Sequence, residues 1–257
     1  MTDQREKSQD FLDLHQPSNP LILFNIWDAG SAKAVAGAGA KAIATGSAPV
    51  AMARGYKDGQ DMPFDDVLQN ARLIVGAVDL PVTLDFEGAY GVEPDEIFTN
   101  VKLALETGVV GFNFEDQVIG GAGLYDMATQ AKRVEAVRHA AEAIDIKVYI
   151  NGRTDIFLKA KPDSHDEAML VDAIARAAAY KEAGASGFFA PGLQNEELIE
   201  HLCREVDMPV NLMQVPGSPS NKRLSFLGAS RISYGPVPFR QMSNWLGEEA
   251  KKAMDLA

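Results

Sequence analysis

The sequence predicts a single (β/α)8 barrel domain over residues 1–257. Eight short apolar runs are bounded by Gly, Pro, Asn or Asp, as strands are. Amphipathic segments with apolar residues three and four apart lie between them, which is the helical period. The length matches the ~250 residues that one such barrel needs. An open doubly wound sheet is the alternative, but it should show fewer strand–helix units.

The expected elements follow one another along the chain with short connections. A polar arm, residues 1–19, comes first and holds a short amphipathic piece. Strands are expected at 21–25, 41–45, 82–85, 109–114, 147–151, 187–190, 209–213 and 231–234. They are apolar on both faces, as parallel strands covered on both sides are. Helices are expected at 30–38, 65–78, 94–107, 128–143, 165–183, 195–205 and 219–228, with a C-terminal helix at 236–256.

Several helix boundaries carry local signals, and nothing divides the chain. Pro94 with Asp95 and Glu96 is typical of a helix start. The glycine-containing segments 37–40, 107–109 and 183–185 are typical of helix ends, where glycine takes the left-handed conformation. No linker, low-complexity tract or composition shift suggests a second domain.

The composition excludes several classes of function. The net charge is −12, from 24 basic and 36 acidic residues, without a basic run, which argues against a nucleic-acid partner. One cysteine excludes an internal disulfide and a multi-cysteine zinc site. No apolar run approaches the ~20 residues that cross a bilayer, so we expect no membrane association and a cytoplasmic protein.

Acidic residues follow several of the expected strands. Asp85 and Glu87 are two apart in an extended stretch, so they project to the same side. Glu115 follows the fourth strand, and Asp58 lies in the loop after the second. Because the carboxyl ends of barrel strands share one face, these acids should converge. An oxygen-only set suits Mg²⁺, with Asp85 and Glu115 as direct or water-bridged ligands and Glu87 and Asp58 holding waters.

Other residues at the same face suggest a small dianionic acid as substrate. The planar fork of Arg153, at the end of the fifth strand, suits a carboxylate. Gly46 and Ser47 open a long loop whose backbone N–H groups suit another anionic oxygen. Asn211, after the seventh strand, completes the substrate-binding set. For Asp116 and Asp155, helix capping or pairing with Arg153 is an equal alternative to a functional role.

The remaining reactive side chains are assigned structural places. Cys203 falls in the helix after the sixth strand, where a small core residue is expected. His15, His139, His165 and His201 fall in helices or the arm, and we expect them at the surface. The residues that begin strands, Lys41, Lys147 and Arg231, are expected to be solvated charges.

Five motifs in order resemble the isocitrate lyase/phosphoenolpyruvate mutase superfamily. The resemblance extends from about residue 8 to residue 240 and includes the stretch 176–192. Each motif alone is weak, but five at matching spacing are specific. They are Trp27-Asp28-Ala29 with Ser31-Ala32, Gly55-Tyr56-Lys57-Asp58, Asp85-Phe86-Glu87-Gly88 with Tyr90-Gly91, Glu115-Asp116, and Arg153-Thr154-Asp155.

The resemblance implies a Mg²⁺-dependent barrel that binds an α-oxoacid or its enolate. It implies a homotetramer, a dimer of dimers, whose C-terminal helix is exchanged between subunits. Carried over, the metal shell would be Asp58, Asp85, Glu87 and Glu115. Gly46 and Ser47 would hold the oxoacid carboxylate, Arg153 would stabilise the enolate, and Trp27 would form a wall of the site.

One loop departs from the resemblance. The lyases carry a Lys-Lys-Cys-Gly-His loop shortly after the Glu-Asp pair, and its cysteine is a general acid. Residues 117–125 here are Gln-Val-Ile-Gly-Gly-Ala-Gly-Leu-Tyr, without cysteine, lysine or histidine. The mutase and phosphonopyruvate hydrolase loop, with lysine and asparagine, is not matched either. The glycines predict a mobile lid, and only Tyr125 in it can exchange a proton.

The sequence therefore predicts a Mg²⁺-dependent enzyme that acts on a small α-oxoacid or its adduct through a metal-bound enolate, with C–C lyase activity first. Arg153, Asp58 and Tyr125 are the expected catalytic residues. P–C bond mutase or hydrolase chemistry on a phosphonopyruvate-like substrate is the second interpretation. A binding protein that keeps the oxoacid site without turnover is the third.

Overall fold

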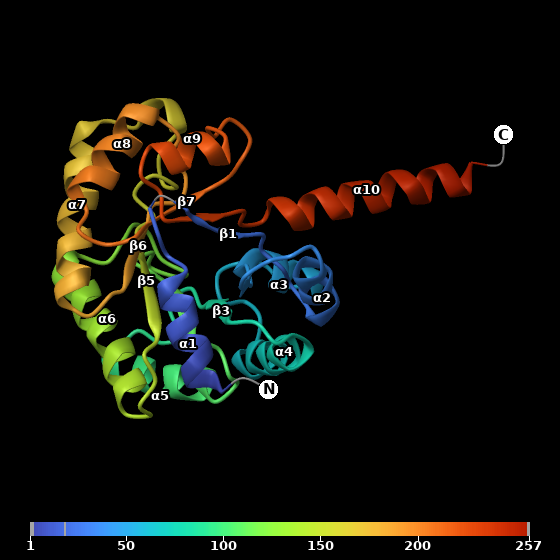
Figure 1. The fold of residues 1–257 in the computed structure, drawn as a ribbon, viewed down its shortest axis with the longest axis horizontal. Helices are drawn as coiled ribbons and strands as arrows, with labels where there is room; N and C mark the ends of the chain where they lie inside the picture. The colour runs from blue at the N-terminus through green and yellow to red at the C-terminus, as the bar shows by residue number, and fades with distance from the viewer. Residues whose placement is uncertain (1–2, 18, 256–257) are drawn as a thin grey trace.

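The chain folds as the predicted barrel. A computed structural model describes residues 3–17 and 19–255, within which eight parallel strands are ringed by helices (Figure 1). Hydrogen-bonded neighbours follow the order β1, β8, β7, β6, β5, β4, β3, β2. A parallel bridge between Ile26 and Thr45 joins the two outer strands and closes the ring. The strands are β1 (Leu21–Leu23), β2 (Ile43–Ala44), β3 (Val82–Asp85), β4 (Gly111–Glu115), β5 (Tyr149–Arg153), β6 (Gly187–Phe189), β7 (Val210–Met213) and β8 (Arg231–Ser233).

The predicted helices are confirmed to within a few residues. Residues 1, 2 and 18 of the predicted arm and residue 256 of the predicted last helix lie outside the described residues. The helices are α1 (Gln4–Asp13), α2 (Ala29–Gly37), α3 (Ser47–Ala53), α4 (Phe64–Ala77), α5 (Pro94–Leu105), α6 (Met127–Glu142), α7 (Glu167–Glu182), α8 (Glu196–Glu205), α9 (Asn221–Phe226) and α10 (Val237–Met254), with a 3-10 turn at Pro162–Ser164.

Helix α3 was not predicted, and it corrects the long loop expected after Gly46. Gly46 is extended and precedes the first helical residue, Ser47. Pro49 lies in the first turn, where its missing N–H is no loss because those N–H groups have no helical partner. Val50 and Ala51 are buried, so packing against the barrel stabilises the short helix.

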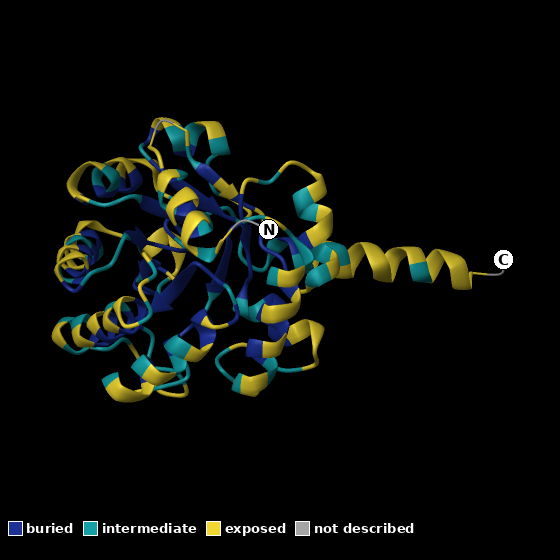
Figure 2. Ribbon diagram, turned by 60° about the horizontal axis from the view of Figure 1, so that its bottom comes forward, coloured by how far each residue is buried: buried dark blue, intermediate teal, exposed yellow. Residues whose placement is uncertain are grey.

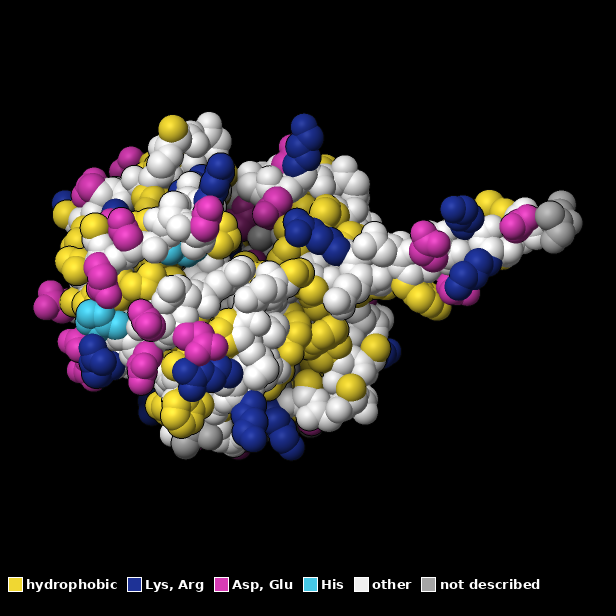
Figure 3. Space-filling view, turned by 90° about the horizontal axis from the view of Figure 1, so that it is seen from above, with side chains coloured by type: hydrophobic (Ala, Val, Ile, Leu, Met, Phe, Trp, Pro, Cys, Tyr) yellow, Lys and Arg dark blue, Asp and Glu magenta, His cyan; other side chains and the backbone are white. Residues whose placement is uncertain are grey.

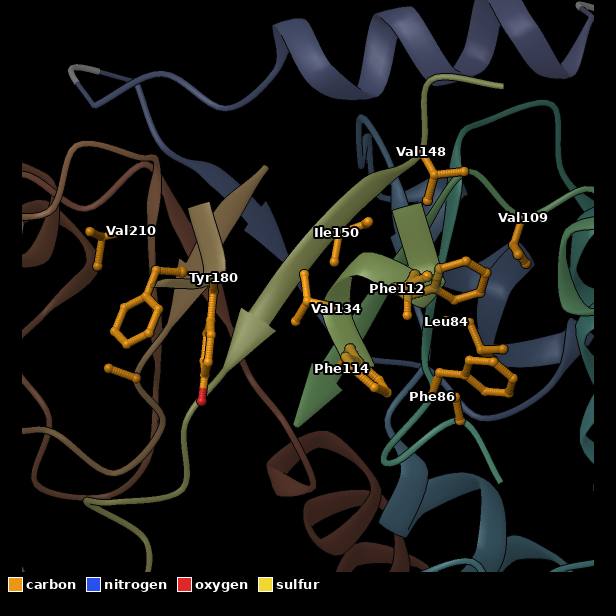
Figure 4. Packing of buried hydrophobic residues seen from close by; sticks show 14 of the residues in the cluster. Leu84, Phe86, Val109, Phe112, Phe114, Val134, Val148, Ile150, Tyr180 and Val210 are labelled. Carbon is orange, nitrogen blue, oxygen red and sulfur yellow. The ribbon is translucent and has the colours of Figure 1, made fainter. Parts of the chain in front are cut away.

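The main core lies between the strands and the surrounding helices. Figure 2 shows the strands as the buried centre and the helices exposed on their outer faces. The rings of Phe86 and Phe112 stack with centroids 5.2 Å apart, and Figure 4 shows them beside Leu84. Strand residues of this kind point outward toward the helices, so their neighbours in the alternation point into the barrel.

Helix α1 covers the amino-terminal end of the barrel. Its Phe11 is fully buried, and His15 beyond the helix is 4% exposed. The imidazole of His15 stacks on the ring of Tyr149 at 3.8 Å. The prediction that His15 lies at the surface was therefore wrong, because the arm folds back onto the strand starts. The side chain of Gln4 donates to the carbonyls of Leu105 and Val109 at 2.9 and 2.8 Å and fixes the helix there.

Arg231 is also buried, inside the barrel, and was wrongly predicted to be solvated. Its guanidinium donates to Asn113 Oδ1 at 3.0 Å and to Ser233 Oγ at 3.3 Å. Large interior side chains also need room elsewhere in the barrel. In β6, next to β5, Gly187 leaves space for Tyr149, since a Cβ on Gly187 would lie 2.0 Å from the Tyr149 hydroxyl. Arg231 is therefore an interior side chain of the barrel rather than a solvated charge at a strand start.

Helix α10 projects from the barrel instead of packing on it (Figure 1). Pro238 is its one buried residue among those described, while Trp245 and Leu246 are 62% and 56% exposed. The outward side chains of Ile22 and Phe24, on and just after β1, are 37% and 41% exposed. Hydrophobic side chains gather on the barrel beside the root of α10 (Figure 3). No helix among residues 3–17 and 19–255 is long and apolar enough to cross a membrane.

Candidate functional site

Asp85 occupies the carboxyl end of β3 and is held from three sides. Its Oδ2 accepts the Ser47 N–H at 2.9 Å, so the first turn of α3 points at the carboxylate. Its Oδ1 accepts the Asn113 amide at 3.3 Å, and its own N–H donates to Thr45 Oγ1 at 2.9 Å. These bonds fix the carboxylate at the mouth of the barrel.

Glu87 lies just beyond Asp85 in a left-handed backbone conformation, with φ of 51°. Its side chain is 6% exposed, and its Oε2 has no hydrogen-bond partner within the protein. Burial, together with the charges of Asp58, Glu115 and Asp85, raises the pKa of the Glu87 carboxyl to about 9. A buried carboxylate oxygen without a partner is costly unless a cation or water meets it.

Arg153 joins the remaining acids. Its Nη1 lies 2.7 Å from Glu115 Oε2 and 3.9 Å from Asp85 Oδ1. Its Nε and Nη2 donate to the two oxygens of Asp155 at 2.6 and 2.9 Å. Burial alone would lower the pKa of Arg153, but Glu115, Asp155 and Asp85 outweigh it and raise the pKa, so the guanidinium stays charged. The Nε–Nη2 edge of the Arg153 guanidinium, which suits a carboxylate, therefore binds Asp155 instead of a substrate.

Burial and like charge act on the other carboxyls as well. Burial raises the pKa of Glu115 to about 8, although Arg153 opposes the shift. Burial also raises the pKa of Asp58; a hydrogen bond from the Ser47 hydroxyl opposes this, and the charge of Asp85 adds to it. Desolvation and mutual repulsion of this kind are relieved when a cation binds.

Two neighbouring cavities contain these acids. A cavity of about 440 Å³ is lined by a polar set of residues, Asn25, Gly46, Ser47, Asp58, Asp85, Asn113, Arg153, Gln194, Ser233 and Arg240. Its other walls are largely apolar and include Phe157, Phe189, Pro191, Met213 and Val237. A second cavity of about 250 Å³ shares Ser47, Asp58 and Arg153 with the first and adds Glu87, Glu115 and Lys159. The acid cluster therefore lies between two spaces that are open to small ligands.

The donor set fits a magnesium ion held partly by water. The available ligands are carboxylate oxygens, which Mg²⁺ prefers, and Glu87 Oε2 is a buried acceptor without a partner. Within the part of the chain that the structure describes, no three His, Cys, Asp or Glu side chains form a group that would hold an ion together. Mg²⁺ commonly takes one or two carboxylates and keeps several waters, so the arrangement suits that mode.

Three predicted site residues lie apart from the cavity linings. Trp27 packs edge-on against Phe239 of α10 at 5.1 Å. Asn211 is fully buried beneath Ser233, to whose hydroxyl it donates at 3.1 Å. The ring of Tyr125 lies 4.2 Å from the guanidinium of Arg133. Their roles in binding and catalysis stay predictions, whereas the acids, Gly46, Ser47 and Arg153 are brought together.

Asp155 pairs with Arg153, as one alternative predicted, and it also lines the smaller cavity, whereas Asp116 neither caps a helix nor pairs with Arg153. Asp116 accepts the Asp155 N–H at 2.9 Å, the Tyr180 hydroxyl at 2.8 Å and Arg176 at 3.1 Å. The two acids hold the ends of β4 and β5 in register beneath the site.

The predicted set of site residues omits the amides of Asn25 and Asn113 and the hydroxyl of Ser233, which line the larger cavity, whereas Cys203 lies in a helix as predicted. Asn25 accepts the N–H groups of Tyr234 and Gly235, both at 2.8 Å, and so ties the ends of β1 and β8 together. Asn25, Asn113 and Ser233 share the inward alternation with acids already noticed, which is the signal that would have found them. Cys203 lies in α8, where burial raises the pKa of its thiol to about 12, so it is unsuited to nucleophilic catalysis.

Comparisons with known proteins identify the family of this chain. The model of the phosphoenolpyruvate phosphomutase family matches residues 11–254. An uncharacterized protein of Mycobacterium tuberculosis H37Rv is 32% identical over 234 residues, 89% of this chain and 83% of that protein. The 2-methylisocitrate lyase of Escherichia coli K12 is 28% identical over 209 residues, 78% of this chain and 68% of that enzyme.

A solved structure extends the likeness to three dimensions. That of a candidate phosphonomutase from Burkholderia cenocepacia J2315 has a TM-score of 0.95 and 41% identity, and the match covers 97% of this chain and 99% of that one. The family match spans nearly the whole barrel, including every strand and the acids at the strand ends. The chain therefore belongs to the phosphoenolpyruvate phosphomutase family, within the isocitrate lyase/phosphoenolpyruvate mutase superfamily.

Proposed function

We propose that the protein is a Mg²⁺-dependent lyase that breaks a C–C bond in a small acid to release an α-oxoacid. The observation that carries this proposal is the buried carboxylate cluster of Asp58, Asp85, Glu87 and Glu115 around Arg153, at the carboxyl ends of the strands. Membership in a superfamily of lyases and mutases agrees with it.

The fit of the donor set indicates which residues would hold the metal. Asp85 and Glu115 would be direct or water-bridged ligands, and Glu87 and Asp58 would accept hydrogen bonds from its waters. When bound, Mg²⁺ would act as a Lewis acid toward the oxygens of the oxoacid. The charged Arg153, which lines both cavities, would stabilise negative charge that develops on the ligand during cleavage.

The apolar walls favour a carbon leaving group. Phe157, Phe189 and Met213 also line the larger cavity, and such surfaces suit hydrocarbon and exclude water. The P–C interpretation has its own support, because the cations Arg240 and Lys159 line the larger and smaller cavities, where a phosphonate group could lie. We therefore keep P–C cleavage as the second candidate.

An activity panel separates the interpretations. The protein with Mg²⁺ is incubated with 2-hydroxy and 2-oxo dicarboxylic acids of increasing alkyl size, and pyruvate or another 2-oxoacid is assayed. Release of the oxoacid supports the lyase, and release of inorganic phosphate from phosphonopyruvate supports the second candidate. If calorimetry shows binding of oxalate or pyruvate but no compound is turned over, the result supports the third interpretation, an oxoacid-binding protein without catalytic activity.

We also propose that the chain assembles as a homo-oligomer, a tetramer, through exchange of α10. The outward faces of Ile22 and Phe24 are partly exposed where a barrel strand normally has a covering helix, and α10 carries exposed Trp245 and Leu246. A second copy of α10 is an occupant of matching chemistry and length for that uncovered face.

A further inference from the structure

Arg133, in α6, is a buried arginine without an ion-pair partner. Its side chain is 1% exposed, and no carboxylate among the described residues lies within ion-pairing distance of it. Burial lowers the pKa of its guanidinium. A buried charge of this kind persists only where neutral groups satisfy its donors, so the identity of those groups is informative.

The donors of Arg133 go mainly to one short segment, residues 88–92. Nη1 donates to the carbonyls of Gly91 and Val92 at 3.1 and 2.8 Å, and Nη2 donates to the carbonyl of Gly88 at 3.2 Å. The faces of the guanidinium lie against the rings of Tyr125 at 4.2 Å and Phe114 at 5.3 Å. The guanidinium is therefore fixed in orientation, and it is hydrogen-bonded to the backbone of residues 88–92.

Left-handed backbone is concentrated at Glu87, which directly precedes that segment, and at two residues within it. Glu87, Ala89 and Tyr90 have φ of 51°, 59° and 53°, in the left-handed region that residues with a side chain rarely adopt. Such a conformation persists only where its surroundings over-determine it. The hydrogen bonds from Arg133 to the carbonyls of Gly88, Gly91 and Val92 belong to those surroundings and begin directly after Glu87.

The same turn of α6 also holds the next acid-bearing strand. Gln130 accepts Arg133 Nε at 3.0 Å, and its own amide donates to the Glu115 carbonyl at 3.0 Å. The Glu115 N–H in turn donates to the Glu87 carbonyl at 3.0 Å. The hydrogen-bonded pair of Arg133 and Gln130 thus connects the backbone just after Glu87 with the backbone of Glu115.

We propose that Arg133 is a positioning residue that holds Glu87 in the strained conformation in which its carboxylate faces the metal site. This inference rests on the proposed function, because it assigns the position of Glu87 to Mg²⁺ binding. Arg133 lines neither cavity, so it would act on the site through the backbone of residues 88–92. Supporting groups of this kind typically change metal affinity by 10–100-fold when they are lost.

The test compares two arginines of the same helix. Arg138 is a matched control, because it too is largely buried and donates to backbone carbonyls, those of Gly184 at 2.8 Å and Val148 at 3.1 Å, at the other end of the barrel. Arg133→Lys keeps the charge and loses the fork. We expect calorimetry to show about tenfold or weaker Mg²⁺ binding for Arg133→Lys and an unchanged dissociation constant for Arg138→Lys.

A double-mutant cycle separates positioning from general destabilisation. In a Glu87→Gln background, Arg133→Lys should cause no further loss of Mg²⁺ affinity, because the carboxylate through which it acts is gone. An equal loss in that background, or in Arg138→Lys, would overturn the inference. If Arg133→Lys does not fold, Tyr125→Leu removes one stacking face and should weaken Mg²⁺ binding about threefold, again only when Glu87 is present.

The result also distinguishes this inference from the proposed function. Wild-type protein that binds Mg²⁺ while Arg133→Lys binds it equally well would refute the role of Arg133 and leave the function standing. Wild-type protein that shows no Mg²⁺ binding in calorimetry would overturn both. Circular dichroism melting of each variant establishes that the proteins compared are folded.

Discussion

Asp85 receives bonds from α3, from Asn113 and, at longer range, from Arg153, so its carboxylate cannot turn away from the mouth of the barrel. We expect Asp85→Ala to abolish binding of both Mg²⁺ and an oxoacid, because the metal loses a ligand and the first turn of α3 loses its anchor. Calorimetric titration with Mg²⁺, and then with pyruvate in its presence, measures this.

Asp61 is a suitable control for that substitution. It is an exposed carboxylate that accepts the Lys57 N–H and lines neither cavity. Asp61→Ala should bind both ligands as the wild type does. Unchanged oxoacid binding by Asp85→Ala would contradict the assignment of the site.

The raised pKa values of Glu87 and Glu115, about 9 and 8, predict how the metal-free protein responds to pH. A carboxyl whose folded pKa lies above its unfolded value stabilises the fold below the unfolded pKa, and this stabilisation is lost as pH rises through the folded pKa. With chelator present, we therefore expect the free energy of unfolding to fall between about pH 5 and 9.

Urea unfolding at several pH values measures that decline. Glu87→Gln should be more stable than the wild type at pH 9, because it removes a buried charge, and Mg²⁺ should restore the wild type at the same pH. A metal-free wild type whose stability is flat across this range would show that these carboxyls are better solvated than the structure indicates.

At the scale of elements, the sequence predicted the regular repeat well, because strand and helix carry different periods. Helix α4 was expected at 65–78 and lies at Phe64–Ala77, and β3 agrees at both ends. Helix α3 was missed because seven residues are too short for a periodic pattern, and its start depends on Asp85, which is distant in sequence.

For the candidate site, the sequence predicted which side chains lie together but not which partners they contact. Strand ends identified the acids and Arg153, since position along a strand fixes which end of the barrel a residue occupies. The partners of those side chains were not predictable, because they depend on register between strands. The Glu115 carboxylate that Arg153 contacts across the β4–β5 pair, and the Asn113 oxygen that Arg231 reaches, are of this kind.

Helix α1 makes a separate prediction through His15. Burial, with Arg231 nearby, lowers the pKa of the imidazole to about 3. A base whose folded pKa is lowered stabilises the fold above its unfolded pKa, about 6.5, and this contribution is lost as pH falls toward the folded value. We expect acid unfolding to begin with release of α1 from the barrel.

His15→Phe keeps the stacking on Tyr149 and removes the titrating group. In urea unfolding, the free energy of unfolding of His15→Phe should fall less between about pH 6 and 4 than that of the wild type. His139→Phe, at an exposed position of α6, should lose as much stability over this range as the wild type does. Equal acid sensitivity of His15→Phe and the wild type would assign the loss to other groups.

At the scale of the whole molecule, α10 does not fit a monomer. A projecting helix whose one buried residue among those described is Pro238 gains little from packing, although packing supplies most of the stability of helices in proteins. Burying Trp245 and Leu246 against the exposed Ile22 and Phe24 of another copy would supply the missing apolar contact for both surfaces. We therefore expect the full chain to sediment as an oligomer, a tetramer if two such dimers associate.

Trp245→Asp combined with Leu246→Asp should shift the protein to smaller species, because each charge would be buried in the exchanged interface. Sedimentation velocity at several concentrations measures the shift. Phe226→Asp is the control, since Phe226 is 76% exposed on α9 and lies outside both proposed surfaces, and it should leave the oligomer intact. A wild-type chain that sediments as a monomer at every concentration would refute the exchange, and α10 would then need a different partner.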